Sequence, residues 1–141
     1  MNRYQNVLVA IDPYSTYQPV LDRALSMVDN PAQLSLIHVT YPQRYFGPYG
    51  GDAYGAEMAQ DWQTKNIEQI NEIAQKNGLP LSQVYTPEGD AADEIHAHAK
   101  NKDCDLIVIG THGQHGLKLL LGSTANAVLH GVKCDVLAVK I

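Results

Sequence analysis

The sequence predicts an α/β domain with one doubly wound, five-stranded parallel sheet and helices on both faces of the sheet. Three observations lead to this fold class. Short apolar runs recur along the chain, segments with the period of a helix lie between them, and most connections are short. Strands that alternate with helices in this way form parallel sheets, because each helix returns the chain across one face by a right-handed crossover.

Five segments have the composition of strands. Val7–Ile11 is short, continuous and apolar, which is typical of a strand that is covered on both faces. The other four predicted strands are Leu34–Val39, Gln83–Tyr85, Leu106–Ile109 and Val136–Val139.

Four segments between these strands show helical periodicity, with apolar residues spaced for one buried face. These residues are Leu21, Ala24, Leu25 and Val28 in the first helix, Ile67, Ile70, Ile73 and Ala74 in a helix over 57–76, Ala92, Ile95 and Ala99 in the third, and Ala125, Val128 and Leu129 in the last.

The helix ends carry their own signals. Asp29-Asn30-Pro31 stops the first helix, and Asn77-Gly78 is a C-cap for the second. Asp90 is the expected N-cap of the third helix, and Gly122-Ser123 opens the last. The aromatic and glycine-rich stretch 41–55 has neither period, and we expect a long mobile loop there. It is either a lid or partner surface, or an exposed connector.

Length and composition limit the function classes. The 141 residues fit one domain over 1–141, and the net charge of −5 with only ten scattered Lys and Arg argues against nucleic-acid binding. No apolar run approaches the roughly 20 residues of a membrane span, and no signal core is present, so we expect a cytoplasmic protein. Cys104 and Cys134 are interpreted as packing residues, with a thiol switch as the alternative.

The carboxyl ends of three predicted strands carry the candidate site, since open parallel sheets bind ligands where the strand order reverses. Asp12, Val39-Thr40 and Gly110 lie at these ends. Between Gly110 and Ser123, further glycines permit close approach of a ligand, and the start of the last helix suits a phosphate. By spacing alone, a plain turn with a capped helix explains this segment equally well. Neither the P-loop nor the dinucleotide glycine pattern is present.

The histidines and the other polar residues give weaker indications of function. His96 and His98 point to different faces of a helix, so a metal site there is not expected. His38 is read as a hydrogen-bonded core residue, whereas His112 and His115 are polar loop residues that can touch phosphate when protonated. No arrangement for nucleophilic catalysis or for orienting water can be argued from the spacing, which favours a binding protein over an enzyme.

Three parts of the chain resemble one family. Gly110-x-x-Gly113, eight further residues and Gly122-Ser123 form the glycine motif. The run that ends at Asp12, the run 36–39 and the ending 134–140 agree with it. Over essentially the whole chain, the sequence resembles the universal stress protein (UspA) family.

The resemblance implies a sheet of strand order 3-2-1-4-5 and a homodimer formed through the last strand. It also implies a site for ATP, or for ADP or AMP, with Mg²⁺ as a further phosphate partner. Asp12 would contact the ribose, the backbone of Val39 would meet adenine, and the glycine motif would surround the phosphates. The complete candidate set is Ala10, Asp12, Val39, Gly110, His112, Gly113, Gly122, Ser123 and Thr124.

Two function classes therefore stay open. The first is a stress-response protein that senses or reports an adenine nucleotide. The second is a nucleotide-free dimeric interaction module of the UspA type, favoured by Pro13 after Asp12 and by the eight-residue interval before Gly122. Any catalysis would be at most slow ATP hydrolysis or self-phosphorylation on Ser123 or Thr124.

Overall fold

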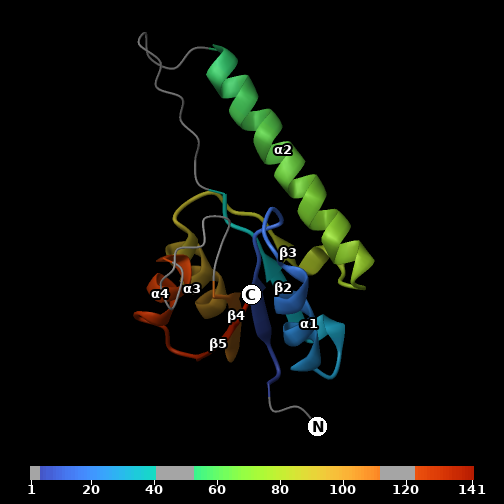
Figure 1. Cartoon of the computed structure of the whole chain (residues 1–141), viewed down its shortest axis with the longest axis vertical. Coiled ribbons are helices and arrows are strands. Elements are labelled where there is room, and N and C mark those ends of the chain that lie inside the picture. The colour runs from blue at the N-terminus through green and yellow to red at the C-terminus, as the bar shows by residue number, and fades with distance from the viewer. Residues whose placement is uncertain (1–3, 41–52, 112–122) are drawn as a thin grey trace.

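The fold is a five-stranded parallel sheet of order β3-β2-β1-β4-β5, as seen in a computed structural model that describes residues 4–40, 53–111 and 123–141 (Figure 1). Both the predicted fold class and the predicted strand order are confirmed. The strands are β1 (Val7–Ala10), β2 (Leu34–Ile37), β3 (Val84–Tyr85), β4 (Leu106–Gly110) and β5 (Asp135–Val139).

The first two strands end earlier than their apolar runs predict. Ile11 still donates its backbone N–H to the carbonyl of Ile37, but the chain then turns at Asp12-Pro13, where proline has no N–H to offer. In the other direction, β4 gains Gly110, which pairs with Val139 of β5. The apolar runs therefore predict where the strands lie, whereas backbone hydrogen bonding determines where each strand ends.

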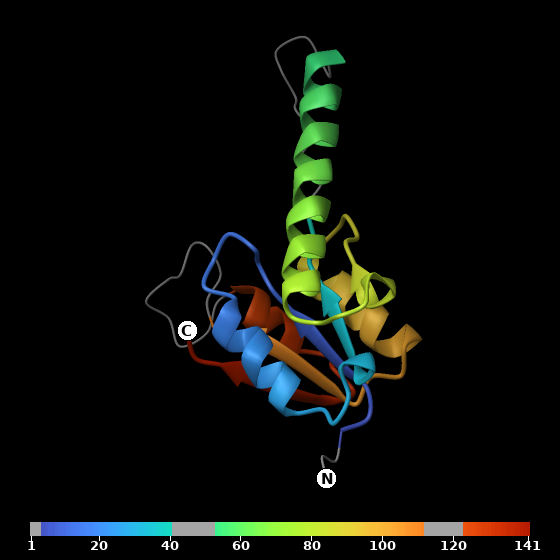
Figure 2. The same ribbon diagram turned by 90° about the vertical axis from the view of Figure 1, so that its right-hand side faces the viewer.

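Two of the described helices cover each face of the sheet (Figure 2). Apolar residues of α1 (Gln18–Ser26) and α2 (Ala53–Lys76) pack on one face, and those of α3 (Ala91–Asn101) and α4 (Ser123–Leu129) pack on the other. Short 3₁₀ turns, η1 (Pro31–Gln33) and η2 (Leu81–Gln83), lead into β2 and β3. The doubly wound arrangement is thus observed.

Most predicted core positions are buried, Leu25 is partly buried, and two are exposed. Ile67 and Leu129 keep 36% and 38% of their surface exposed. On α2, Asn66 occupies the buried position four residues before Ile70. Its neighbour Ile67 therefore lies on the flank of the helix. The prediction was wrong there because an apolar pattern cannot show that a polar residue takes the inward position.

Helix α2 begins at Ala53, earlier than the predicted start at residue 57. The predicted loop over 41–55 is therefore wrong for its last three residues, because one glycine, Gly55, costs only about 1 kcal/mol in a helix and does not end it. The remainder of that loop lies outside the described residues. Figures 1 and 2 show the N-terminal half of α2 extending past the carboxyl edge of the sheet.

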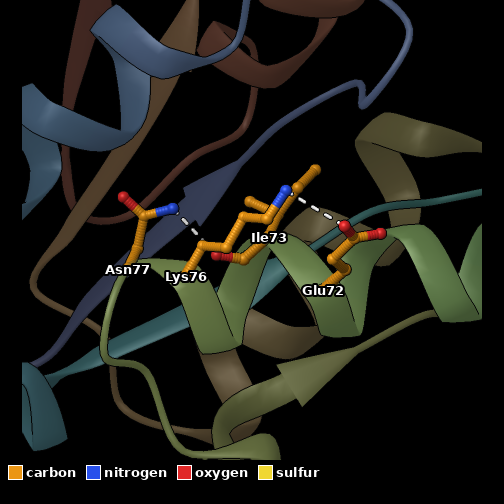
Figure 3. Close-up of polar contacts among 4 residues, drawn as sticks. All are labelled: Glu72, Ile73, Lys76 and Asn77. Carbon is orange, nitrogen blue, oxygen red and sulfur yellow. Dashed lines mark hydrogen bonds and ion pairs between the residues drawn. The ribbon is translucent and has the colours of Figure 1, made fainter.

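The other end of α2 closes as predicted. Asn77 donates from Nδ2 to the carbonyl of Ile73 at 2.8 Å, and Lys76 forms an ion pair with Glu72 at 3.0 Å (Figure 3). Gly78 then takes a φ of +74°, the left-handed conformation that a helix C-cap requires. The predicted N-cap of α3 is confirmed too, since an Asp90 carboxylate oxygen accepts the Asp93 N–H at 3.0 Å.

Candidate functional site

The strand order reverses between β1 and β4. From β1 the chain proceeds outward to β2 and β3, then crosses back to β4 on the other side of β1. The last residues of these two adjacent strands, Ala10 and Gly110, therefore lie beside each other at the carboxyl edge. This is the place where doubly wound sheets leave a crevice for a ligand.

Asp12 follows β1 at this edge and is held in a tight turn. Its Oδ1 accepts the backbone N–H of Tyr14 at 2.9 Å, and its carbonyl accepts both the N–H and the hydroxyl of Ser15 at 3.1 Å. Among the described residues, Oδ2 has no hydrogen-bond partner. The carboxylate is thus oriented by the turn through one of its two oxygens.

The segment after β2 lies next to this turn. The His38 ring Nδ1 lies 3.2 Å from the carbonyl of Ile11, as expected for a hydrogen-bonded core histidine. Burial lowers the pKa of His38, and the Ile11 carbonyl and the nearby Asp12 carboxylate oppose that shift. Val39 packs partly against the α3 and α4 side of the core. A mostly neutral imidazole therefore borders the Asp12 turn.

The third strand end is the start of the glycine segment. After Gly110, Thr111 donates its N–H to the Val139 carbonyl at 2.9 Å and accepts the Ile141 N–H on its hydroxyl at 3.2 Å. Helix α4 begins at Ser123, as predicted, and runs back between two parallel strands, so its first residues belong to the same edge. Thr124, the second residue of α4, is exposed.

Five of the candidate residues are thus gathered at one edge by the described strands and helix, with Thr124 beside them. These five are Ala10, Asp12, Val39, Gly110 and Ser123. The other three, His112, Gly113 and Gly122, lie outside the described residues, as does His115.

A polar cluster at this edge was missed by the sequence analysis. Asn66 of α2 is 1% exposed, its Oδ1 accepts the Tyr14 hydroxyl, and its Nδ2 lies 3.5 Å from Thr40 Oγ1. The Trp62 ring stacks on that of Tyr14. One signal was present in the sequence: Asn66 occupies an inward position in a helix whose other inward residues are apolar.

The remaining histidines and cysteines have structural contacts. His96 Nε2 lies 2.7 Å from the Val128 carbonyl on α4, whereas His98 Nδ1 lies 3.0 Å from the Glu94 carbonyl of its own helix. Within 4–40, 53–111 and 123–141, no cluster of three or more potential metal-ligating side chains occurs. Cys104 and Cys134 pack in the α3 and α4 side of the core, and burial raises the pKa of both thiols, to about 11 at Cys104.

None of the described helices combines the length and apolarity that a membrane crossing needs. The fold and the carboxyl edge together define a class: a doubly wound α/β domain with a candidate ligand site at its switch point.

Comparison with known proteins gives the family. The universal stress protein family model matches residues 3–140. The chain is 41% identical over 144 residues to universal stress protein A homolog 2 of Coxiella burnetii, with 100% of this chain and 98% of the relative covered. The chain belongs to the universal stress protein family, which confirms the resemblance.

Two solved structures extend the comparison. Universal stress protein UspA from Lactobacillus plantarum superposes with a TM-score of 0.81 at 22% identity and 99% coverage of each chain, which supports the fold. A universal stress protein in complex with cAMP is 28% identical, with a TM-score of 0.60 and 97% coverage of each chain.

Proposed function

We propose that this universal stress protein is a cytoplasmic stress-response protein that binds ATP, ADP, AMP or a related adenine nucleotide and reports its presence to a partner. The observation that carries the proposal is the adjacency of Asp12 and Gly110, which follow and end the two strands that flank the switch point. A carboxylate that accepts ribose hydroxyls and a glycine that admits phosphate are what a nucleotide requires at such an edge.

Three further facts support an adenine nucleotide. The glycines at 110, 113 and 122 precede Ser123 in the order of the family motif, with eight residues between Gly113 and Gly122. The backbone of Val39 lies two residues beyond the end of β2, where the family resemblance puts adenine, and a related protein has been solved with the adenine nucleotide cAMP. With a net charge of −5, phosphate binding would depend on backbone N–H groups and Mg²⁺. His112, Gly113, Gly122, Ser123 and Thr124 are the proposed phosphate side of the site.

The experiment starts with the protein as purified. Denaturation followed by chromatography of the supernatant detects any nucleotide that was carried along. Calorimetric titration with ATP, AMP and cAMP, each with and without Mg²⁺, then gives the affinities. We expect binding by the wild type and at least tenfold weaker binding by Asp12→Ala, on the order of one charged hydrogen bond. Asp22→Ala, an exposed aspartate on α1, is the matched control.

The second candidate is a nucleotide-free interaction module. It is favoured by the Asp12 turn, because Oδ1 is already occupied by the Tyr14 N–H and Pro13 stiffens the chain beside it. Absence of released nucleotide, together with no heat of binding at millimolar ATP, would establish this candidate and reject the first.

We propose for both candidates a homodimer that is formed through β5. This strand is at one edge of the sheet, and its residues Val136, Leu137 and Ala138 are only partly buried in the single chain. An apolar edge strand is a ready interface for a symmetry-related copy. Sedimentation should give twice the chain mass of 15.5 kDa, and Leu137→Lys should halve it. A wild-type mass of 15.5 kDa at micromolar concentration contradicts the dimer.

A further inference from the structure

Tyr14 connects the Asp12 turn to α2 by three contacts. Its backbone N–H donates to Asp12 Oδ1 at 2.9 Å. Its ring stacks on Trp62, with centroids 5.4 Å apart and 12° between the planes, and its hydroxyl donates to Asn66 Oδ1. Because Trp62 and Asn66 are four residues apart on a helix, they form one continuous surface that receives the tyrosine ring and its hydroxyl together.

The Asn66 end of this connection is buried and is shared with Thr40, three residues after β2. The Asn66 amide is 1% exposed, and its Nδ2 is 3.5 Å from Thr40 Oγ1, at the outer limit of a hydrogen bond. Thr40 is itself fixed, since its N–H donates to the Pro87 carbonyl and its carbonyl accepts the Gly89 N–H, both at 3.0 Å. A buried amide that loses a partner is costly, so Asn66 holds the Tyr14 hydroxyl firmly.

We propose that Tyr14 is a positioning residue for the ligand carboxylate Asp12, and that α2 holds Tyr14 in place through Asn66 and Trp62. The inference rests on the proposed function, because Asp12 is the group that is positioned. Rotation of the Asp12 carboxylate away from the Tyr14 N–H would break a bond to a backbone that cannot follow, since the tyrosine ring is anchored. The carboxylate is therefore already oriented before a ligand binds, which reduces the entropic cost of binding.

The coupling also runs toward α2. Trp62 is the single tryptophan of the chain, 41% exposed, and it lies in the N-terminal half of α2. Any shift of the Asp12 turn on ligand binding is passed through the Tyr14 ring to Trp62. Tryptophan emission thus reports the state of the turn without an added probe.

The first measurement needs no ligand. Hydrogen exchange of the Tyr14 and Ser15 amides, which donate to Asp12, reports how firmly the turn is held. We expect Tyr14→Phe and Asn66→Leu each to accelerate exchange at these amides by about tenfold, with the amides of β1 unchanged. Tyr4→Phe is the matched control, because it also removes one tyrosine hydroxyl bond, to Asp135, at the opposite edge of the sheet. Unchanged exchange in both test variants overturns the inference.

The second measurement uses ATP. We expect Tyr14→Phe to weaken binding by about three- to tenfold, the equivalent of one hydrogen bond, and Tyr4→Phe to leave it unchanged. The double variant Tyr14→Phe/Asn66→Leu should bind no more weakly than Asn66→Leu alone, because both changes remove one and the same link. The change in Trp62 emission on adding ATP should shrink in Tyr14→Phe at saturating ligand, which a purely structural residue would not cause.

The two proposals fail separately. If the wild type binds ATP and Tyr14→Phe binds it equally well with the same Trp62 response, the positioning role is overturned and the proposed function stands. If the wild type binds no nucleotide, the proposed function falls, and the exchange rates of the Tyr14 and Ser15 amides still decide whether α2 holds the Asp12 turn.

Discussion

The two edges of the sheet use aspartate in opposite ways. At the amino edge, Asp105 precedes β4, and its two carboxylate oxygens accept the backbone N–H groups of Gln5 at 2.8 Å and Asn6 at 3.0 Å. At the carboxyl edge, Asp12 accepts one backbone N–H, and its second oxygen has no partner among the described residues. Both carboxylate oxygens of Asp105 thus bond to backbone of the chain itself, whereas among the described residues only one oxygen of Asp12 does.

The neighbours of the two aspartates continue this contrast. Around Asp105, Tyr4 donates to Asp135, and Asn6 donates from its side chain to the Lys102 carbonyl. These contacts tie the chain start to β4 and β5 and leave the amino edge closed. Around Asp12, the neighbours are a partly buried histidine and the Tyr14–Asn66 connection, and the Tyr14 N–H orients the carboxylate. The contacts that complete the amino edge and the proposed ligand site thus lie at different ends of the same strands.

The largest expected effect comes from removing the amino-edge carboxylate. Asp105→Ala deletes two charge-assisted hydrogen bonds and leaves two backbone N–H groups without their acceptor, so we expect a loss of about 3 kcal/mol in the free energy of unfolding. Asp12→Ala deletes one such bond at a more open position and should cost about 1 kcal/mol. Urea denaturation of both variants measures the difference.

For the affinity for ATP, the order of the two variants should be the reverse. Asp105→Ala, studied at a temperature where it is folded, should bind ATP as tightly as the wild type does. Asp12→Ala should bind ATP at least tenfold more weakly. Equal losses of stability in the two variants would refute the contrast between the edges.

The next effect concerns the thiol of Cys104, which lies at the amino edge. Burial raises the pKa of Cys104 to about 11, two units above its ordinary value of 9.0, which lowers its thiolate fraction by about a hundredfold at neutral pH. Alkylation of the folded protein by iodoacetamide should therefore modify Cys104 at least a hundredfold more slowly than alkylation in urea. Peptide mass analysis of each cysteine over time provides the rates. Rapid labelling of Cys104 in the folded state would contradict the packing interpretation and favour the alternative of a thiol switch.

Most of the fold was predictable from the sequence because all the described strands except the short β3 are local apolar runs. Val7–Ile11 and Leu106–Ile109 need no partner to be recognised, and their alternation with helices implies a parallel sheet. The family motif then supplied the strand order. Asp12 and Gly110 could be placed at the site because they directly follow or end such runs, and the carboxyl ends of parallel strands share one edge.

The contacts that orient the site could not be predicted in the same way. Tyr14 and Asn66 are 52 residues apart, and Gln5 and Asp105 are 100 apart. Periodicity shows which face of α2 turns inward, but it does not show which loop that face meets. The start of α2 was also missed, since tyrosine and glycine at positions 54 and 55 have the composition of a loop and are nonetheless helical.

The smallest expected effect is a pH dependence that originates at the carboxyl edge. Burial lowers the pKa of His38 below the 6.5 of an unfolded histidine, so the unfolded chain binds this proton more readily. Stability from the neutral imidazole is therefore fully present above pH 6.5 and is lost as the pH falls through the folded-state pKa. The urea midpoint should decline on acidification from pH 7.5, before the carboxylates titrate.

The variant His38→Gln should flatten this decline, because glutamine can still donate to the Ile11 carbonyl and has no proton to gain. His130→Gln, at an exposed position after α4, is the matched control and should keep the wild-type slope. If both variants keep the slope, the acid sensitivity arises elsewhere. If His38→Gln alone flattens it, the group that makes the carboxyl edge acid-sensitive is the imidazole next to the Ile11 carbonyl, one residue before Asp12.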